Sequence, residues 1–431
     1  MARILIYAMN YAPEMAGVGR YNGEIGEFFA RCGHEVAVVT TIPHYPDWKA
    51  ASPYRGGRYV EERLGGVDVA RCPLLLREPM RGLWRVAAPL SFAVASAPVA
   101  LWRAVRLRPD LVLCVEPTLM IAPIALVAAR LVGAKTALHV QDLEVDAAFA
   151  VGHLARRDWL KRLAAYCERA LLRRFDRLVT ISVGMAQRLT AKGVDAARIA
   201  VVHNWVDIDA IKPLERTSVY RAELGLGAAD RIVLYSGAIG AKQGFDDVID
   251  AAARLARRND IQFIIAGEGP AKRGLVARAA GLRNVRFLPF QPYERLSEFL
   301  GLADLHILPQ AAGAADLVLP SKLGGMLASG RRIVVTAAPG TELARFVAGA
   351  AIVVPPSDID ALVEAVERAA DDMRPDADAV AFRRRLAERL AKSDGLKQFE
   401  ALVVRWEPIA ARRLAAAGGP AFAPRPGEVA G

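Results

Sequence analysis

The sequence predicts an α/β protein built from two doubly wound, parallel-sheet domains. Its 431 residues exceed an ordinary single domain, so two domains of roughly 200 residues each are expected. Short apolar runs alternate with helical segments along most of the chain, which is typical of parallel sheets covered by helices on both faces. Hydrophobic residues make up 53% of the sequence, which is enough for two full cores.

The first half of the chain contains a series of short apolar runs that we predict to be strands. They lie at 3–10, 35–41, 67–72, 110–116, 135–140, 177–181 and 199–203. Helices are expected between them at about 20–31, 121–131, 156–173 and 183–192. These elements assign residues 1–204 to an N-terminal Rossmann-like domain.

A second series follows a stretch at 205–218 that has little periodicity, includes Pro213 and is predicted to be a linker. Its expected strands lie at 231–236, 261–266, 285–288, 305–308, 333–335 and 352–354. They define a second Rossmann-like domain at 219–395, and the two domains are expected to face each other across a cleft. A helix at 396–414 is expected to cross back to the first domain, and 415–431 form a Gly-, Pro- and Ala-rich flexible tail.

Charge and cysteine content narrow the possible partners. The net charge of +11 favours anionic partners such as nucleotides, phosphates, nucleic acid or an acidic membrane surface. No basic and aromatic face or known module indicates nucleic-acid binding. The four cysteines form no CxxC or Cys/His cluster, so neither a zinc site nor a disulfide framework is predicted. This cysteine pattern suits a reducing cytosol, so a cytoplasmic protein is expected. The N-terminus reads as a strand and not as a signal peptide.

One segment raises the question of membrane contact. No charged residue lies between Val86 and Trp102, and Pro89 and Pro98 interrupt this Ala-rich run. The arginines that flank it are Arg77, Arg81, Arg85, Arg103, Arg106 and Arg108. The pattern fits a surface that touches anionic lipid, and it equally fits a buried helix with solvated ends. Whether residues 83–106 insert into a membrane stays open at this level.

Candidate anion-binding groups lie in loops of the second half. The loop at 237–244 places Gly237 and Lys242 between a strand and a helix, which suits a diphosphate although it is not a P-loop. A second Gly-rich loop contains Gly267 and Glu268. The strand, loop and helix at 308–335 contribute the candidates Asp316, Ser321 and Lys322, with Ser321 expected as the helix N-cap.

Candidates in the first half also follow predicted strands. Gly17 and Gly19 precede the first helix and permit close approach of the backbone to a ligand. His139, Asp142 and Glu144 crowd the carboxyl end of the strand at 135–140, the edge at which parallel sheets bind ligands. A structural, hydrogen-bonded role for the histidine is the alternative. Asn204 ends the domain and is a further ligand candidate.

Several motifs together resemble a known family. They are YAPEMAGVGRYNGE, HVQDLEVDAAF, FDRLVTIS, HNWVD, LYSGAIGAKQG, GEGP, LPFQPYERL and GAADLVLPSKL with LASG. Each is weak alone, but all of them in this order are similar to family 4 glycosyltransferases of the GT-B fold, and most similar to bacterial exopolysaccharide enzymes of the colanic-acid type. The resemblance covers about residues 3–405.

The resemblance implies sugar transfer from a UDP- or GDP-linked donor to a polyprenyl-diphosphate-linked glycan, with retention of anomeric configuration and no metal or other cofactor. It implies an acceptor-side first domain, a nucleotide-sugar-binding second domain and peripheral contact with the inner face of the plasma membrane. Lys242 and the Gly237 loop would stabilise the departing diphosphate. His139, with Asp142 beside it, would hold a sugar hydroxyl or carry part of the positive charge, in a front-face mechanism.

The sequence departs from the family pattern at three positions. The family commonly has Glu-x7-Glu where this chain has Leu317 and Gly325, and Asp316 is the expected substitute for the first glutamate only. Ala238 stands where an arginine often follows Gly237. The missing acidic pair keeps a non-catalytic nucleotide-sugar-binding scaffold as an alternative, and a nucleotide-sugar 2-epimerase of the same fold is another.

Overall fold

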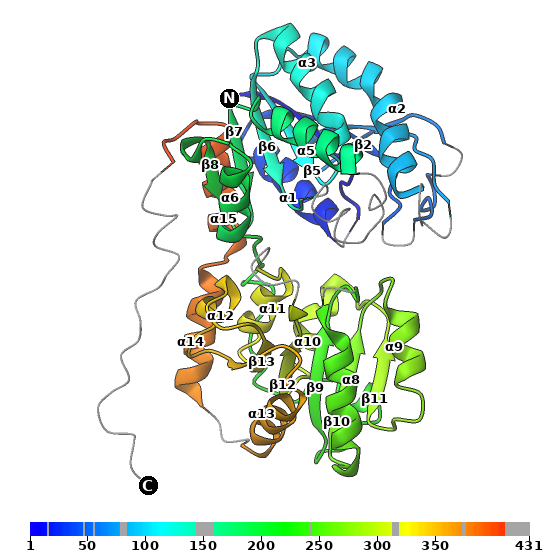
Figure 1. Cartoon of the computed structure of the whole chain (residues 1–431), viewed down its shortest axis with the longest axis vertical. Helices are drawn as coiled ribbons and strands as arrows, with labels where there is room; N and C mark the ends of the chain where they lie inside the picture. The colour runs from blue at the N-terminus through cyan, green and yellow to red at the C-terminus, as the bar shows by residue number, and fades with distance from the viewer. Residues whose placement is uncertain are drawn as a thin grey trace. The chain divides into compact units, whose positions relative to one another are not determined.

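A computed structural model describes residues 1–14, 17–45, 48–54, 57–77, 84–143, 158–240, 243–312, 319–372 and 376–409. The chain separates into two compact units. Unit 1 comprises Met1–Trp205 together with Leu390–Ile409, and unit 2 comprises Val206–Arg389 (Figure 1). Both are α/β units with a parallel or mostly parallel sheet, which confirms the predicted fold class.

The sheet of unit 1 has eight strands in the order β3-β4-β2-β1-β5-β6-β7-β8. Their bounds are β1 Arg3–Tyr7, β2 Glu35–Thr41, β3 Val60–Leu64, β4 Val67–Cys72, β5 Leu111–Glu116, β6 Lys135–Val140, β7 Arg177–Thr180 and β8 Ile199–Val201. Only β3 runs antiparallel, and the sequence analysis missed it because its residues VEERL are mostly polar. A short, mostly polar strand of this kind fits the exposed edge of a sheet.

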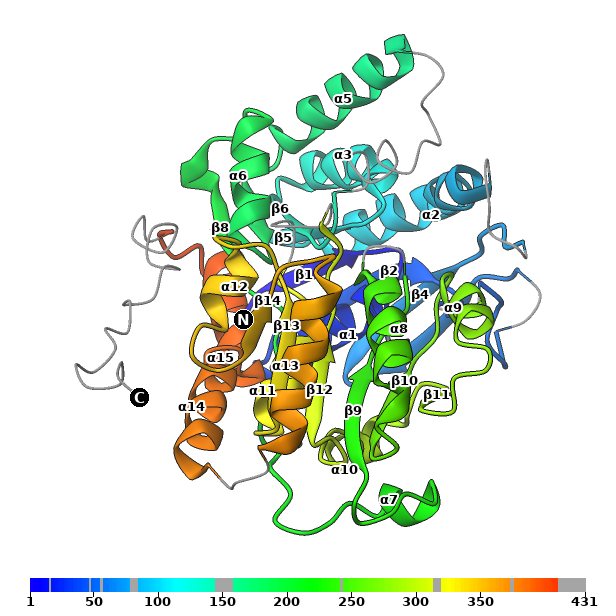
Figure 2. The same cartoon turned by 60° about the horizontal axis from the view of Figure 1, so that its bottom comes forward.

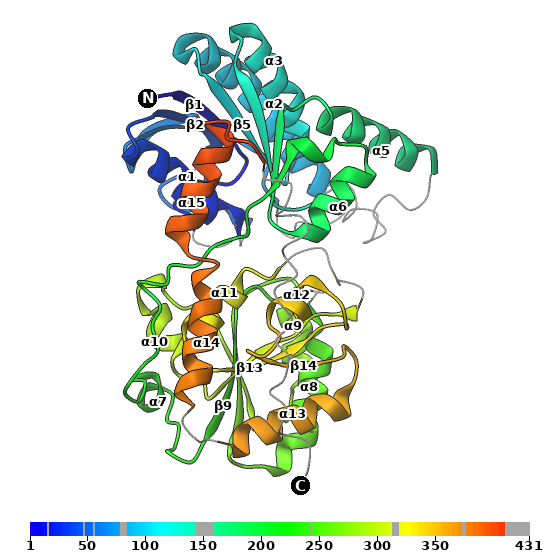
Figure 3. The same cartoon turned by 90° about the vertical axis from the view of Figure 1, so that its left-hand side faces the viewer.

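Helices cover both faces of this sheet (Figure 3). They are α1 Val18–Arg31, α2 Trp84–Leu107, α3 Ala122–Val132, α5 Asp158–Leu172, α6 Val183–Ala191 and α15 Lys392–Val403. Helices α1 and α15 lie on one face, while α2, α3, α5 and α6 lie on the other. The side chains of β1 alternate in agreement with this arrangement of helices. Ile6 joins the core under α1, whereas Tyr7 hydrogen-bonds Ser96 of α2.

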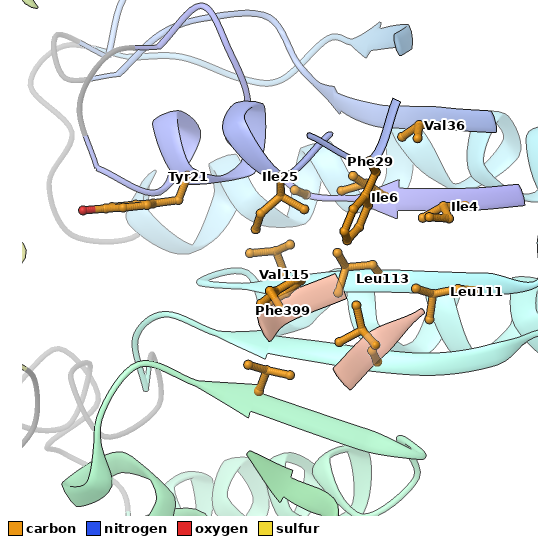
Figure 4. Close-up of a cluster of buried hydrophobic side chains, with 14 of the residues drawn as sticks. Ile4, Ile6, Tyr21, Ile25, Phe29, Val36, Leu111, Leu113, Val115 and Phe399 are labelled. Carbon is orange, nitrogen blue, oxygen red and sulfur yellow. The ribbon is translucent and has the colours of Figure 1, made fainter. Parts of the chain in front are cut away.

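Helix α15 completes the core of unit 1 although it lies far along the chain. Phe399 packs against Phe29 of α1 at a ring distance of 6.3 Å and joins the cluster of β-strand side chains (Figure 4). Burying one such side chain contributes about 1.5–3 kcal/mol. The Trp205 ring lies where a Cβ at Gly395 would meet it at 2.9 Å, and its Nε1 donates to Glu24. Helix α15, at Lys392–Val403, both starts and ends earlier than the helix expected at 396–414.

Unit 2 contains a six-stranded parallel sheet in the order β11-β10-β9-β12-β13-β14. Its strands are β9 Arg231–Ser236, β10 Ile261–Ala266, β11 Val285–Leu288, β12 Leu305–Leu308, β13 Arg332–Thr336 and β14 Ile352–Val354. Its helices are α7 Tyr220–Glu223, α8 Phe245–Arg254, α9 Lys272–Arg278, α10 Leu296–Leu300, α11 Lys322–Ala328, α12 Glu342–Phe346, α13 Ile359–Asp371 and α14 Ala377–Glu388. Strand order reverses between β9 and β12, which is where open sheets of this kind bind ligands.

Candidate active site

In unit 2, the loops that follow β9 and β10 touch each other through glycines. Gly237 N donates to Ala266 O, and Ile239 N donates to Glu268 O. A Cβ at Gly267, whose φ is +150°, would lie only 1.8 Å from Gly237 O. Gly267, one of the predicted site residues, therefore allows the two loops to cross at the carboxyl end of the sheet. The side chain of Glu268 pairs with Lys272 at 2.6 Å.

Lys322 lies under this crossing, at the first turn of α11. Its ammonium donates to the Tyr235 hydroxyl at 2.7 Å, and that hydroxyl donates to Ala238 O. Gly237 makes room for the lysine, since a Cβ there would lie 2.6 Å from Lys322 Cε. Among the described residues no carboxylate forms an ion pair with the ammonium. Burial lowers the pKa of Lys322 to about 8.

Helix α11 differs in detail from the sequence analysis. Ser321 precedes the helix and is exposed, but its backbone is helical (φ −58°, ψ −26°) and its side chain makes no capping hydrogen bond. Gly325 is buried, and a Cβ there would already lie 3.1 Å from Leu300. A side chain at this position would therefore need Leu300 to move by a few tenths of an ångström.

In unit 1, Gly17 and Gly19 accommodate side chains of the protein itself. Gly17 has φ +66°, and a Cβ there would meet the Tyr45 ring at 3.3 Å. A Cβ at Gly19 would lie 2.7 Å from the Glu14 carboxylate. Glu14 is buried and accepts hydrogen bonds from His44 N, Tyr45 N and the Asn10 side chain. The glycines thus let Glu14 tie the loop after β1 to the loop after β2.

His139 lies inside unit 1, at the end of a buried amide network. Gln141 Nε2 lies 3.1 Å from His139 Nε2, and the Gln141 and Asn204 amides exchange two hydrogen bonds of 3.1 and 3.0 Å. The imidazole is 1% exposed and packs against Phe399 at 4.8 Å. Burial lowers its pKa to about 3, so the ring is neutral at pH 7. Asp142 follows the strand half-buried, and its carboxylate accepts from Leu143 N.

The buried His139 should make unit 1 sensitive to acid. Its pKa is about 3 when folded against 6.5 ordinarily, so the unfolded chain binds the extra proton between these values. Stability from this group is complete above pH 6.5 and should fall by about 1.4 kcal/mol per pH unit as the pH drops toward 4. All six tryptophans (48, 84, 102, 159, 205 and 406) belong to unit 1, so their fluorescence in urea titrations reports this unit.

The control for this prediction lies in the same unit. His139→Gln should remove most of that slope, whereas His203→Gln, at a half-buried histidine, should leave it as in the unmodified protein. An unchanged slope in His139→Gln would show that this imidazole is protonated in the folded state.

Three predicted site residues, Glu144, Lys242 and Asp316, lie outside the described residues. Within the described ranges, no group of three His, Cys, Asp or Glu side chains could hold a metal ion. The structure also brings in residues that the sequence analysis did not select, namely Glu14, Arg71, Gln141 and Tyr235. Glu14, Gln141 and Tyr235 stand inside motifs that carry the family resemblance, and Gln141 also follows the same strand as His139 and stands next to Asp142. Arg71 carried no such signal.

Two family profiles match the chain, one for each half. The Glycosyl transferase 4-like domain matches residues 16–205, and Glycosyl transferases group 1 matches residues 230–372. The chain is 40% identical over 408 residues to the Escherichia coli (strain K12) protein named as the colanic acid biosynthesis glycosyl transferase WcaI. That alignment covers 92% of this chain and 98% of the relative.

Solved structures share the fold at low sequence identity. Sucrose-phosphate synthase from Thermosynechococcus elongatus gives a TM-score of 0.74 at 16% identity, covering 94% of this chain and 99% of that one. Anabaena HepE in complex with UDP-glucose gives a TM-score of 0.67 at 15% identity, covering 94% of this chain and 100% of that one. The resemblance inferred from the motifs is confirmed. The chain belongs to the family that joins a glycosyl transferase 4-like domain to a glycosyl transferases group 1 domain, and it is a glycosyltransferase with two Rossmann-like units of the GT-B type.

Proposed function

We propose that this protein is a retaining hexosyltransferase that moves a sugar from a UDP- or GDP-linked donor to a polyprenyl-diphosphate-linked glycan, in the synthesis of an exopolysaccharide or another cell-surface polysaccharide. The observation that carries the proposal is the Lys322 ammonium, held by Tyr235 beside Gly237 without a carboxylate among the described residues. A half-buried cation at the carboxyl end of a parallel sheet suits an anionic ligand. WcaI, which is named for colanic acid biosynthesis, and HepE, which was solved with UDP-glucose, support the polysaccharide and the nucleotide-sugar.

The chemistry assigns different roles to the two units. As the bond between sugar and phosphate breaks, negative charge grows on the diphosphate, and Lys322 would oppose it. Lys242 and Asp316 remain candidates for further donor contacts. In unit 1, the neutral His139 would position Gln141 and Asn204 and would not carry charge, because its ring is buried. Asp142, at the end of β6, would face the sugar.

The reaction is expected to need no divalent metal, because Lys322 would take the place of a cation at the diphosphate. Transfer should therefore persist at full rate in excess EDTA. We expect the enzyme to work at the cytoplasmic face of the membrane, where a lipid-linked acceptor presents its glycan.

The test uses purified full-length protein, a panel of UDP- and GDP-hexoses and extracted bacterial polyprenyl-diphosphate glycans. Mass spectrometry should detect an acceptor heavier by one hexose, and NMR of the product should show the anomeric configuration of the donor. A product formed from the nucleotide-sugar without acceptor would identify an epimerase. Nucleotide binding without an extended acceptor and without an epimerised nucleotide-sugar would favour the non-catalytic scaffold. The missing acidic pair is the reason to consider this alternative.

A further inference from the structure

The ring and the hydroxyl of Tyr235, near the carboxyl end of β9, have different surroundings. Helix α8 lies along β9 (Figure 2), and the ring makes a T-shaped contact with Phe245, the first residue of α8, with the ring centres 4.6 Å apart. A phenylalanine would fill this space equally well, so packing does not require the hydroxyl. The side chain is fully buried, and a buried hydroxyl is costly unless it is hydrogen-bonded. This hydroxyl binds polar groups of two other segments.

The hydrogen bonds of this hydroxyl have a fixed direction. An ammonium can only donate and a carbonyl can only accept, so Tyr235 accepts from Lys322 and gives its single proton to Ala238 O. The ammonium has three N–H groups and uses one of them for this bond. Within the described part of the chain, the other two have no hydrogen-bond partner. They are therefore available to donate to two oxygens of one anion.

The loop that contains Ala238 is held in place independently of the lysine. Gly237 N and Ile239 N, on either side of Ala238, donate to carbonyl groups at the end of β10 and in the loop after it. Lys322 reaches this loop on a long side chain with several rotatable bonds. The hydroxyl of Tyr235 therefore links a flexible cation to a rigid loop. Groups that are held in place before charge develops stabilise that charge most effectively.

We infer that Tyr235 is a positioning residue for anion binding in unit 2, whose hydroxyl, anchored on Ala238 O, directs the Lys322 ammonium toward a diphosphate group beside the Gly237 loop. The tyrosine acts through the lysine and not by touching the anion. Position 238, where the family often has an arginine, contributes its carbonyl here, and a cation from α11 stands beside the loop instead. The inference rests on the proposed function only for identifying the diphosphate as that of a nucleotide-sugar.

The test measures binding of inorganic pyrophosphate to the full-length protein by isothermal titration calorimetry. Tyr235→Phe keeps the ring, which contacts Phe245 and lies 4.9 Å from the Lys322 ammonium, and removes the hydroxyl alone. The dissociation constant should rise about ten-fold, which corresponds to one hydrogen bond to a charged group. In a Lys322→Met protein the same change should have no further effect, because the tyrosine acts through the ammonium.

The pH dependence of pyrophosphate binding is a readout that a loss of packing would not move. Burial lowers the pKa of Lys322 to about 8, and the bond to the Tyr235 oxygen favours the charged form. On the neighbouring loop after β10, Glu268 and Lys272 pair with each other, so Tyr235 is the titratable group that faces the ammonium among the described residues. Tyr235→Phe should therefore move the alkaline loss of binding about one unit to lower pH. Titration of pyrophosphate itself is common to all variants and cancels in the comparison.

Tyr220→Phe is the matched control. Tyr220 is also buried in unit 2, and its hydroxyl donates to Gln291 and not to the Lys322 site. This variant should bind pyrophosphate as the unmodified protein does. Both tyrosine variants should unfold at similar urea concentrations when followed by circular dichroism, which separates a loss of binding from a loss of fold.

Three results would overturn the inference: no pyrophosphate binding by the unmodified protein, unchanged binding and pH profile in Tyr235→Phe, or an equal loss when Tyr235→Phe is added to Lys322→Met. Pyrophosphate binding that depends on the Tyr235 hydroxyl, without sugar transfer from any UDP- or GDP-hexose, would support the inference and count against the proposed function alone.

Discussion

Replacing Lys322 with methionine should lower kcat/KM for the nucleotide-sugar donor by about 100-fold or more, the usual cost of removing a group that stabilises charge in the transition state. Methionine keeps the length and apolar stem of the side chain, so the contact with Gly237 and the start of α11 should survive. Initial rates at several donor concentrations measure the effect. Lys212→Met, at an exposed lysine of the same unit, is the matched control and should retain full activity.

The same lysine predicts an alkaline limit on activity. Its pKa is lowered to about 8 by burial, and only the protonated form can pair with a diphosphate. The kcat/KM for the donor should therefore be constant below pH 8 with respect to this group, and should fall about ten-fold per pH unit above it. Lys322→Arg should retain part of the activity and lose the alkaline decline, because a guanidinium stays charged there.

A Lys322→Met enzyme with unchanged donor kinetics would remove Lys322 from the donor site. The proposed anion site would then have to rest on Lys242 and on backbone groups.

The strands of unit 2 show what the sequence could predict. The expected strands at 231–236, 261–266, 285–288 and 305–308 coincide with β9, β10, β11 and β12. Parallel strands covered on both faces are continuous apolar runs, and flanking glycines or polar residues mark their ends. The structure of the uncharged segment at 86–102 was harder to predict, because Pro89 and Pro98 argue against a helix. Both nevertheless lie inside α2. Packing against the sheet outweighs the local cost of the prolines.

Contacts between distant residues could not be predicted in the same way. The burial of His139 depends on Phe399, which returns from the far end of the chain, and no local pattern encodes that contact. Tyr235 and Lys322 meet only because β9 ends, and α11 begins, at the same edge of the sheet. The sequence predicted that Gly17 and Gly19 allow close approach to the backbone, and the structure places Tyr45 and Glu14 against them. A glycine in a loop therefore indicates a close approach without identifying what approaches.

Among the substitutions considered, Arg71→Met has the largest expected effect on stability at neutral pH. The arginine is 1% exposed at the end of β4, and its guanidinium donates to Glu62, to Thr41 O and to Ala12 O, in the loop after β1. The Tyr54 ring lies 4.9 Å from its Cζ. Removing one partner of a buried pair costs about 3–5 kcal/mol, and partial exposure of Glu62 places the expected loss near the lower end. Arg71→Met should therefore destabilise unit 1 by about 3 kcal/mol in urea titrations followed by tryptophan fluorescence.

The control and a second variant separate the physical causes. Arg63→Met, at the exposed arginine of neighbouring β3, should change stability by no more than about 0.5 kcal/mol. If the cost of Arg71→Met comes from the unpaired Glu62, then Arg71→Met with Glu62→Gln should recover part of it. If it comes instead from the freed carbonyls of Ala12 and Thr41, the double variant should be no more stable than the single one. In that second case the loss lies in the backbone that carries Glu14 and Gly17. Arg71 would then act on the candidate site by holding its first loop in place. If Arg71→Met alone is nearly as stable as the unmodified protein, both causes are excluded.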